Sequence, residues 1–95
     1  MAEHVGKITE IKVGSFFTGG PDPIDMGAIT LKETSTGLAF VLHLWVSHSN
    51  EPALQRVLQS QRLALVREAA FRNLTVRVTT PSTTSDLIET IQVFL

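Results

Sequence analysis

One segment of this chain has helical spacing, and it lies between two regions that read as β-strand. Its apolar side chains recur every three or four residues in two stripes rotated from each other, Leu54, Val57, Leu58, Gln61, Leu65 and Leu63, Val66, Ala70. A helix with two stripes either bends near residues 59–62 or is buried on two sides. A single helix in this place restricts the fold to mainly β arrangements.

The ends of this helix carry recognisable signals. Ser49 or Asn50 can cap the first turn, and Pro52 suits an opening position. Asn73 suits a left-handed stop.

Three strands are expected before the helix. The first covers residues 4–13, where Ile8 breaks the parity of the other β-branched side chains, so we expect a bulge. A loop over residues 15–25 follows, because two glycines and two prolines cannot continue a strand. Residues 27–34 and 38–47 then form a hairpin around Ser35-Thr36-Gly37.

Two further strands are expected after the helix. Residues 74–80 alternate, with Val76 and Val78 inward and Arg77 outward. A polar loop covers residues 81–86. The last segment, 87–95, favours a strand by composition, although Asp86 and Glu89 have capping-box spacing and leave a helix open.

The order β-β-β-α-β-β within one domain, residues 1–95, is the order of the OB-fold, a five-stranded Greek-key barrel. RLALVREAAFRNLTVRV, residues 62–78, resembles the passage from helix to fourth strand in small bacterial OB-fold proteins of the toxin B-subunit type. The resemblance concerns architecture: it implies an OB-like barrel and names no ligand. The alternative is an open α+β sheet with the helix packed on one face.

Composition narrows the function. The 95 residues can bury only a modest core, so association of several copies is expected. The net charge of -1 provides no field that would gather phosphate backbones. The chain has no cysteine, no export signal and no apolar run of about 18 residues, so we expect a cytoplasmic protein that does not enter a membrane.

No motif points to a cofactor, a metal or catalysis. If the third strand continues through His48, then His43 and His48 face opposite sides and cannot bind one metal together. His4 could join either one, but nothing requires it. The chain has neither a Gly-x-Ser-x-Gly turn nor a phosphate-binding glycine loop, so we expect no enzyme, with an enzyme of unknown class as the third hypothesis.

The third strand carries the strongest functional signal, because both of its faces are apolar. Its inward row comprises Phe40, Leu42, Leu44 and Val46, and its outward row comprises Val41, His43 and Trp45. Covering a tryptophan removes about 200 Å² from water, so we expect the outward row to be covered. Phe16 and Phe17 of the same chain, or a second subunit, could cover it.

We therefore interpret the chain as a homo-oligomer that binds a protein or a small ligand through this strand and the loops at 15–25 and 81–86. The alternative is a single-stranded nucleic-acid binder. In that case Lys32, His43, Trp45 and Arg77 would face outward toward the nucleic acid, beside Phe16 and Phe17 on the first loop. Against it, the first loop is acidic and the helical arginines form no basic stripe.

Overall fold

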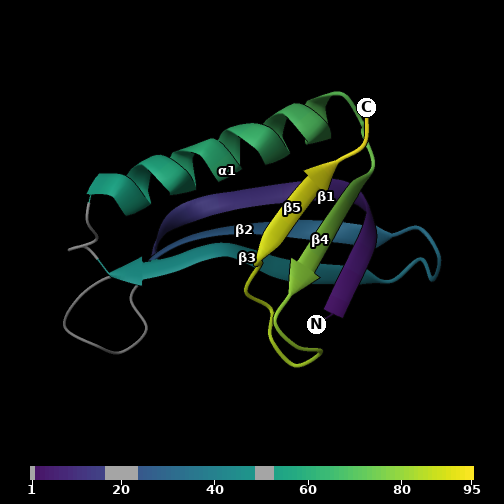
Figure 1. Cartoon of the computed structure of the whole chain (residues 1–95), viewed down its shortest axis with the longest axis horizontal. Coiled ribbons are helices and arrows are strands. Elements are labelled where there is room, and N and C mark those ends of the chain that lie inside the picture. The colour runs from purple at the N-terminus through teal and green to yellow at the C-terminus, as the bar shows by residue number, and fades with distance from the viewer. Residues whose placement is uncertain (1, 17–23, 49–52) are drawn as a thin grey trace.

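The computed structural model describes residues 2–16, 24–48 and 53–95. The described residues form five strands and one helix in the predicted order (Figure 1): β1 (Ala2–Phe16), β2 (Ile24–Glu33), β3 (Ala39–His48), α1 (Ala53–Phe71), β4 (Val76–Thr80) and β5 (Thr90–Val93). The C-terminal segment is thus a strand. No helix in this part of the chain is long and apolar enough to span a bilayer.

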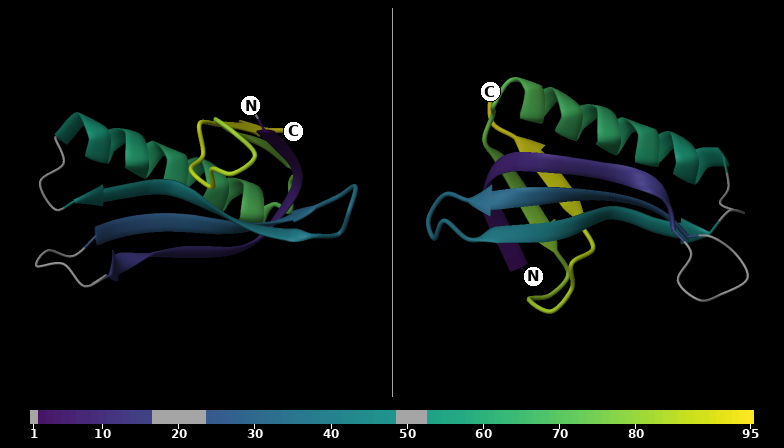
Figure 2. Two further views of the ribbon diagram at one scale, coloured as in Figure 1. Left: turned by 90° about the horizontal axis from the view of Figure 1, so that it is seen from below. Right: turned by 180° about the vertical axis from the view of Figure 1, so that it is seen from behind.

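All five strands belong to one antiparallel sheet in the order β3-β2-β1-β4-β5. The helix runs along the layer formed by β1, β2 and β3, and β4 and β5 cross one end of that layer (Figure 2). The sheet is not closed into a barrel, so the open-sheet alternative describes it. The arrangement is compatible with an OB-like architecture.

β1 is the strand that pairs on both sides. Residues 2–6 pair with β4 and residues 6–16 pair with β2, and the strand curves strongly between these two parts (Figure 1). Gly6 belongs to both ladders, opposite Glu33 on β2 and Val76 on β4. A Cβ atom at Gly6 would lie 2.0 Å from the backbone oxygen of Lys32. The two ladders can therefore meet only at a residue without a side chain.

The bulge expected in β1 is present at Thr9. Ile8 pairs with Leu31, whereas Glu10 pairs with Thr30, so Thr9 is the extra residue. The insertion lets Ile8 and Ile11 contact the same core cluster despite their odd separation in sequence. The core lies between the sheet and α1, and its buried members are Ile29, Leu31, Leu42, Leu44, Val66, Ala69, Val76, Val78 and Ile88.

Only one of the two helical stripes packs into this core. Val66 is fully buried, and Leu63 and Ala70 are half-buried. Val57, Leu58 and Leu65 of the other stripe remain exposed. The described part of the helix is therefore buried on one side, and its second apolar stripe faces outward.

The helix ends as its sequence predicts. Asn73 has a φ angle of 53°, and the amide of Leu74 donates to the carbonyl of Ala69 at 2.9 Å. These are features of a Schellman motif. Lys7 donates from Nζ to the Asn73 carbonyl at 3.0 Å, which places a cation at the negative end of the helix dipole.

β3 meets the segment that leads into β5 at one point. The amide of His43 on β3 donates to the Asp86 carbonyl at 2.7 Å, and the amide of Ile88 donates to the His43 carbonyl at 2.8 Å. These two bonds form a single parallel bridge between His43 and Leu87. No further ladder joins the two edges among the described residues.

Beyond that bridge, the side chain of Arg62 on α1 makes the hydrogen bonds between the two edges. Its Nη1 donates to the carbonyls of Leu44 at 3.2 Å and Ile88 at 3.3 Å, and its Nη2 donates to the carbonyl of Glu89 at 3.4 Å. One guanidinium thus connects β3 with the segment that enters β5.

Gly6→Ala should destabilise the fold by about 3 kcal/mol or more, because the new methyl group meets backbone that belongs to two ladders. Chemical denaturation measures this change. Gly37→Ala is the control: its φ of 73° makes alanine cost about 1–2 kcal/mol, and nothing lies within 4 Å of the added atom. An equal loss of unfolding free energy in the two variants would contradict the close approach of the two ladders at Gly6.

Arg62→Met should lower the free energy of unfolding by about 1.5–3 kcal/mol, because three carbonyls lose a charged donor while the aliphatic stem is kept. Urea denaturation gives the value. Arg67→Met removes an exposed arginine of the same helix and should change it by less than about 0.5 kcal/mol. An unchanged free energy of unfolding in Arg62→Met would show that the guanidinium does not hold the two edges together.

Candidate functional site

Trp45 lies on the inner face of the sheet, so the prediction that it faces outward was wrong. Gly27 pairs with Trp45, but Ala28 pairs with His43, so Leu44 is an extra residue in β3. Such a bulge shifts every later residue to the opposite face. Trp45 consequently shares the face of Gly27, and Val46, predicted inward, is 50% exposed.

The indole of Trp45 is covered by its own sheet. A Cβ atom at Gly27 would lie 2.5 Å from the indole ring, which shows that the ring rests directly on this glycine. Trp45 also packs against the buried core. Its Nε1 is buried and has no hydrogen-bond partner among the described residues.

The predicted cover for Trp45 lies largely outside the described part of the chain. Phe16 is the last residue of β1 and pairs with Ile24, but its side chain lies outside the described residues. Phe17 lies outside them altogether.

Val41 and His43 do lie on the outer face, as predicted. Four cross-strand pairs make up this outer face of β2 and β3: Met26 with Val46, Ala28 with His43, Thr30 with Val41, and Lys32 with Ala39. Val41 is 58% exposed. These pairs are mainly apolar, and Lys32 lies at one end of them.

Among the described residues, no ladder covers the edge of β3 beside Val41. His43 turns its backbone N–H and C=O away from β2, toward Asp86 and Ile88. Alternate residues of an antiparallel strand direct these groups to the same side, so Val41 turns its own N–H and C=O to the same edge. The parallel bridge is a single one, so it does not extend to Val41. Val41 thus combines an exposed apolar side chain with an open strand edge.

The three histidines lie in different places. His43 Nδ1 is 3.3 Å from the Asp86 carboxylate, and His4 Nδ1 is 3.2 Å from the Glu33 carboxylate. His48 ends β3, and its side chain is outside the described residues. Within residues 2–16, 24–48 and 53–95, no three possible metal ligands converge.

Lys32 and Arg77, predicted to act together, lie on strands separated by β1. Arg77 has its Nε 3.5 Å from the Glu3 carboxylate and its guanidinium carbon 5.3 Å from the centre of the Phe94 ring. Lys32 is exposed and has no ion-pair partner among the described residues.

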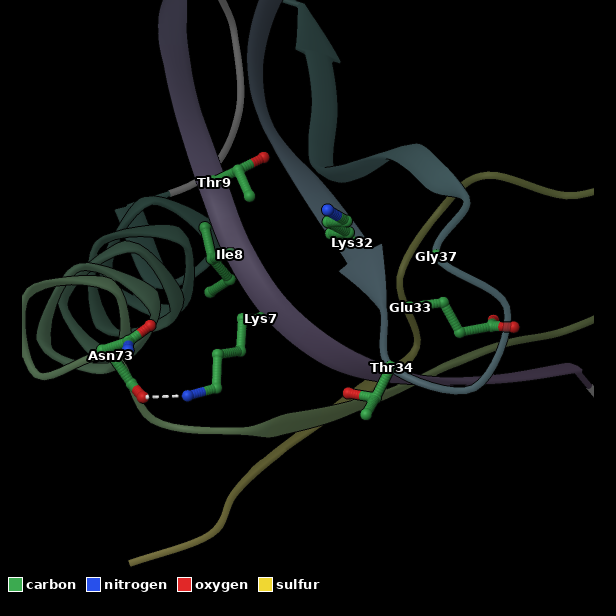
Figure 3. Close-up of a pocket in the computed structure, with 8 residues that line it drawn as sticks. All are labelled: Lys7, Ile8, Thr9, Lys32, Glu33, Thr34, Gly37 and Asn73. Atoms are coloured by element: carbon green, nitrogen blue, oxygen red, sulfur yellow. Dashed lines mark hydrogen bonds between the residues drawn. The ribbon is translucent and has the colours of Figure 1, made fainter.

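A hollow of about 410 Å³ opens where Lys32 lies (Figure 3). We call it the basic hollow. It lies beside the turn between β2 and β3 and is lined by Lys7, Ile8, Thr9, Lys32, Glu33, Thr34, Gly37 and Asn73. Sequence reasoning identified Lys32 but missed the other residues. The register that sets Lys7 opposite Lys32 depends on the bulge at Thr9, which a sequence does not place to the residue.

Glu33 borders the basic hollow, but its carboxylate points away from Lys7 and Lys32 (Figure 3). It contacts His4 and accepts from the hydroxyls of Ser35 at 3.3 Å and Thr36 at 3.0 Å. The hydrogen bond with His4, followed by the one from Thr36, lowers the pKa of Glu33. The His4 ring in turn packs on Phe40, with centroids 4.5 Å apart.

Glu33→Gln should lower the thermal midpoint at neutral pH and flatten its acid dependence. Because folding lowers the Glu33 pKa below 4.5, its stabilisation is present above pH 4.5 and is lost as pH falls through the folded pKa. Circular dichroism melts from about pH 7 to pH 3 measure both effects. Glu10→Gln, an exposed carboxylate on β1, is the control, and an identical acid profile in the two variants would contradict the role of Glu33.

Comparison with known proteins adds no relative. No protein-family model matches the chain, and neither a curated protein nor a solved structure does. The candidate surfaces therefore rest on the geometry described above.

Proposed function

We propose that this chain is a non-enzymatic, cytoplasmic interaction module of OB-like architecture that works as a homo-oligomer and binds its partners through the sheet. The observation that carries the proposal is Val41, a 58% exposed valine on the open edge of β3. Leu38, just before β3 in the connection from β2, is 59% exposed. An edge strand with exposed apolar side chains invites pairing with another chain.

A second copy of this chain is the occupant that fits the edge best. Two β3 strands can pair antiparallel across a two-fold axis, because each offers the same donors, acceptors and side chains. Among the four described pairs of this outer face, Lys32 at one end is the one lysine, arginine or carboxylate, so charge does not oppose the contact. Trp45 takes no part in this contact, since it lies on the inner face.

The uncovered stripe of α1 also supports association. Val57, Leu58 and Leu65 are exposed apolar side chains on one helix of a small protein. Burying such surfaces against another copy adds to the apolar area that a 95-residue chain can remove from water.

The alternative, a single-stranded nucleic-acid binder, has less support. Base stacking needs an accessible aromatic ring, and Trp45 rests on Gly27 instead. Arg77 already contacts Glu3 and Phe94. Lys32 is the one residue of the predicted basic set that has no such contact among the described residues.

Val41→Lys should break the association, because the new ammonium would be buried at the centre of the contact. We expect the dissociation constant of the oligomer to rise by about tenfold or more, as is usual when a central apolar residue is lost. Light scattering and sedimentation at several protein concentrations measure the mass.

Val13→Lys is the matched control: Val13 is 51% exposed but belongs to the opposite face of the sheet. It should leave the mass unchanged. A wild-type chain that stays monomeric at high concentration, or an equal loss of mass in both variants, would overturn the proposed contact.

A further inference from the structure

Lys7 and Lys32 lie directly opposite each other in the ladder between β1 and β2, and both are exposed. Like charges at directly opposed positions destabilise a sheet. Such local conflicts are expected at functional or strained sites. The bond from Lys7 to the Asn73 carbonyl accounts for Lys7, whereas no hydrogen bond or ion pair among the described residues accounts for Lys32.

The surrounding carboxylates do not neutralise this pair. Glu33 is engaged by His4 and points away from the lysines (Figure 3). Glu10, the next outward position of β1, forms no ion pair with either lysine among the described residues. Lys7 gives one of its donors to the Asn73 carbonyl at 3.0 Å, which leaves two, and Lys32 keeps all three of its donors.

The basic hollow around the two lysines has the size and lining of a small-molecule site. Its volume of about 410 Å³ falls in the range of ligand pockets. Ile8 and the aliphatic stems of the lysines provide carbon walls, and the hydroxyl of Thr34 points toward Lys7 (Figure 3). Such a lining suits a ligand with an apolar body and one anionic head.

We propose that the basic hollow binds a small organic anion, a carboxylate or a phosphate monoester, whose charged head lies between Lys7 and Lys32 and accepts from Thr34. A single copy of the chain supplies every residue named. The site therefore needs no second copy of the chain and stands even if the contact through β3 fails.

Phenyl phosphate and phenylacetate are suitable probes, because each joins one anionic head to an apolar ring. Either probe is titrated into ¹⁵N-labelled protein at constant ionic strength. Saturable amide shifts should be confined to residues 7–9, 32–37 and 73, and saturation should raise the thermal midpoint. The tighter of the two probes identifies the preferred head group.

Lys32→Gln should weaken the tighter probe by about tenfold or more, as expected for loss of a charged hydrogen bond. It should also raise the thermal midpoint of the unliganded protein, because the repulsion with Lys7 disappears. Lys12→Gln removes the same charge from β1 outside the hollow and should leave the affinity unchanged.

Three results would overturn the proposal. In the first, neither probe saturates. In the second, the shifts spread over all lysines. In the third, Lys12→Gln and Lys32→Gln weaken binding equally. A higher thermal midpoint for Lys32→Gln with unchanged probe affinity would also contradict the proposal. Lys32 would then destabilise the fold without contributing to binding.

Discussion

The close approach of three strands at Gly6 is the constraint on which the rest of the structure depends. β1 pairs with β2 along most of its length and with β4 at its start, and both ladders include Gly6. The strand can curve from one partner to the other because no side chain separates them there. This curvature brings β4 and β5 across the layer of β1, β2 and β3, and thereby encloses the core against α1.

The element order, the strand at the C-terminus and the helix stop at Asn73 were predictable, because each depends on local pattern and local chemistry. The face of Trp45 was not. Its prediction assumed strict alternation, and the extra residue Leu44 reverses the face of everything after it. Leu44 and Trp45 are both apolar, so their pattern hides the bulge. The clue lies in Gly27, whose missing side chain makes room for an indole.

The candidate surfaces were predictable only where strict alternation of side chains holds. Val41 and His43 precede the bulge of β3, so alternation placed them correctly on the outer face. The basic hollow combines residues from β1, the end of β2 and the end of α1. Its assembly depends on the register after the Thr9 bulge and on the position of the helix end, which are tertiary features. Lys32 belongs to both surfaces, at the end of the outer face and inside the hollow.

The connection made by Arg62 bears on how the protein opens. A strand ladder resists separation through many bonds that must break together, whereas β3 and β5 are joined by one parallel bridge and one side chain. The seam between them is therefore the boundary where sub-global unfolding should begin. Opening there would separate β3 from the segment that enters β5, while the ladder of β1 with β4 would still hold β4 and β5 to the sheet. The meander of β1, β2 and β3 and the pair of β4 and β5 would then remain connected through the first part of β1, next to Gly6.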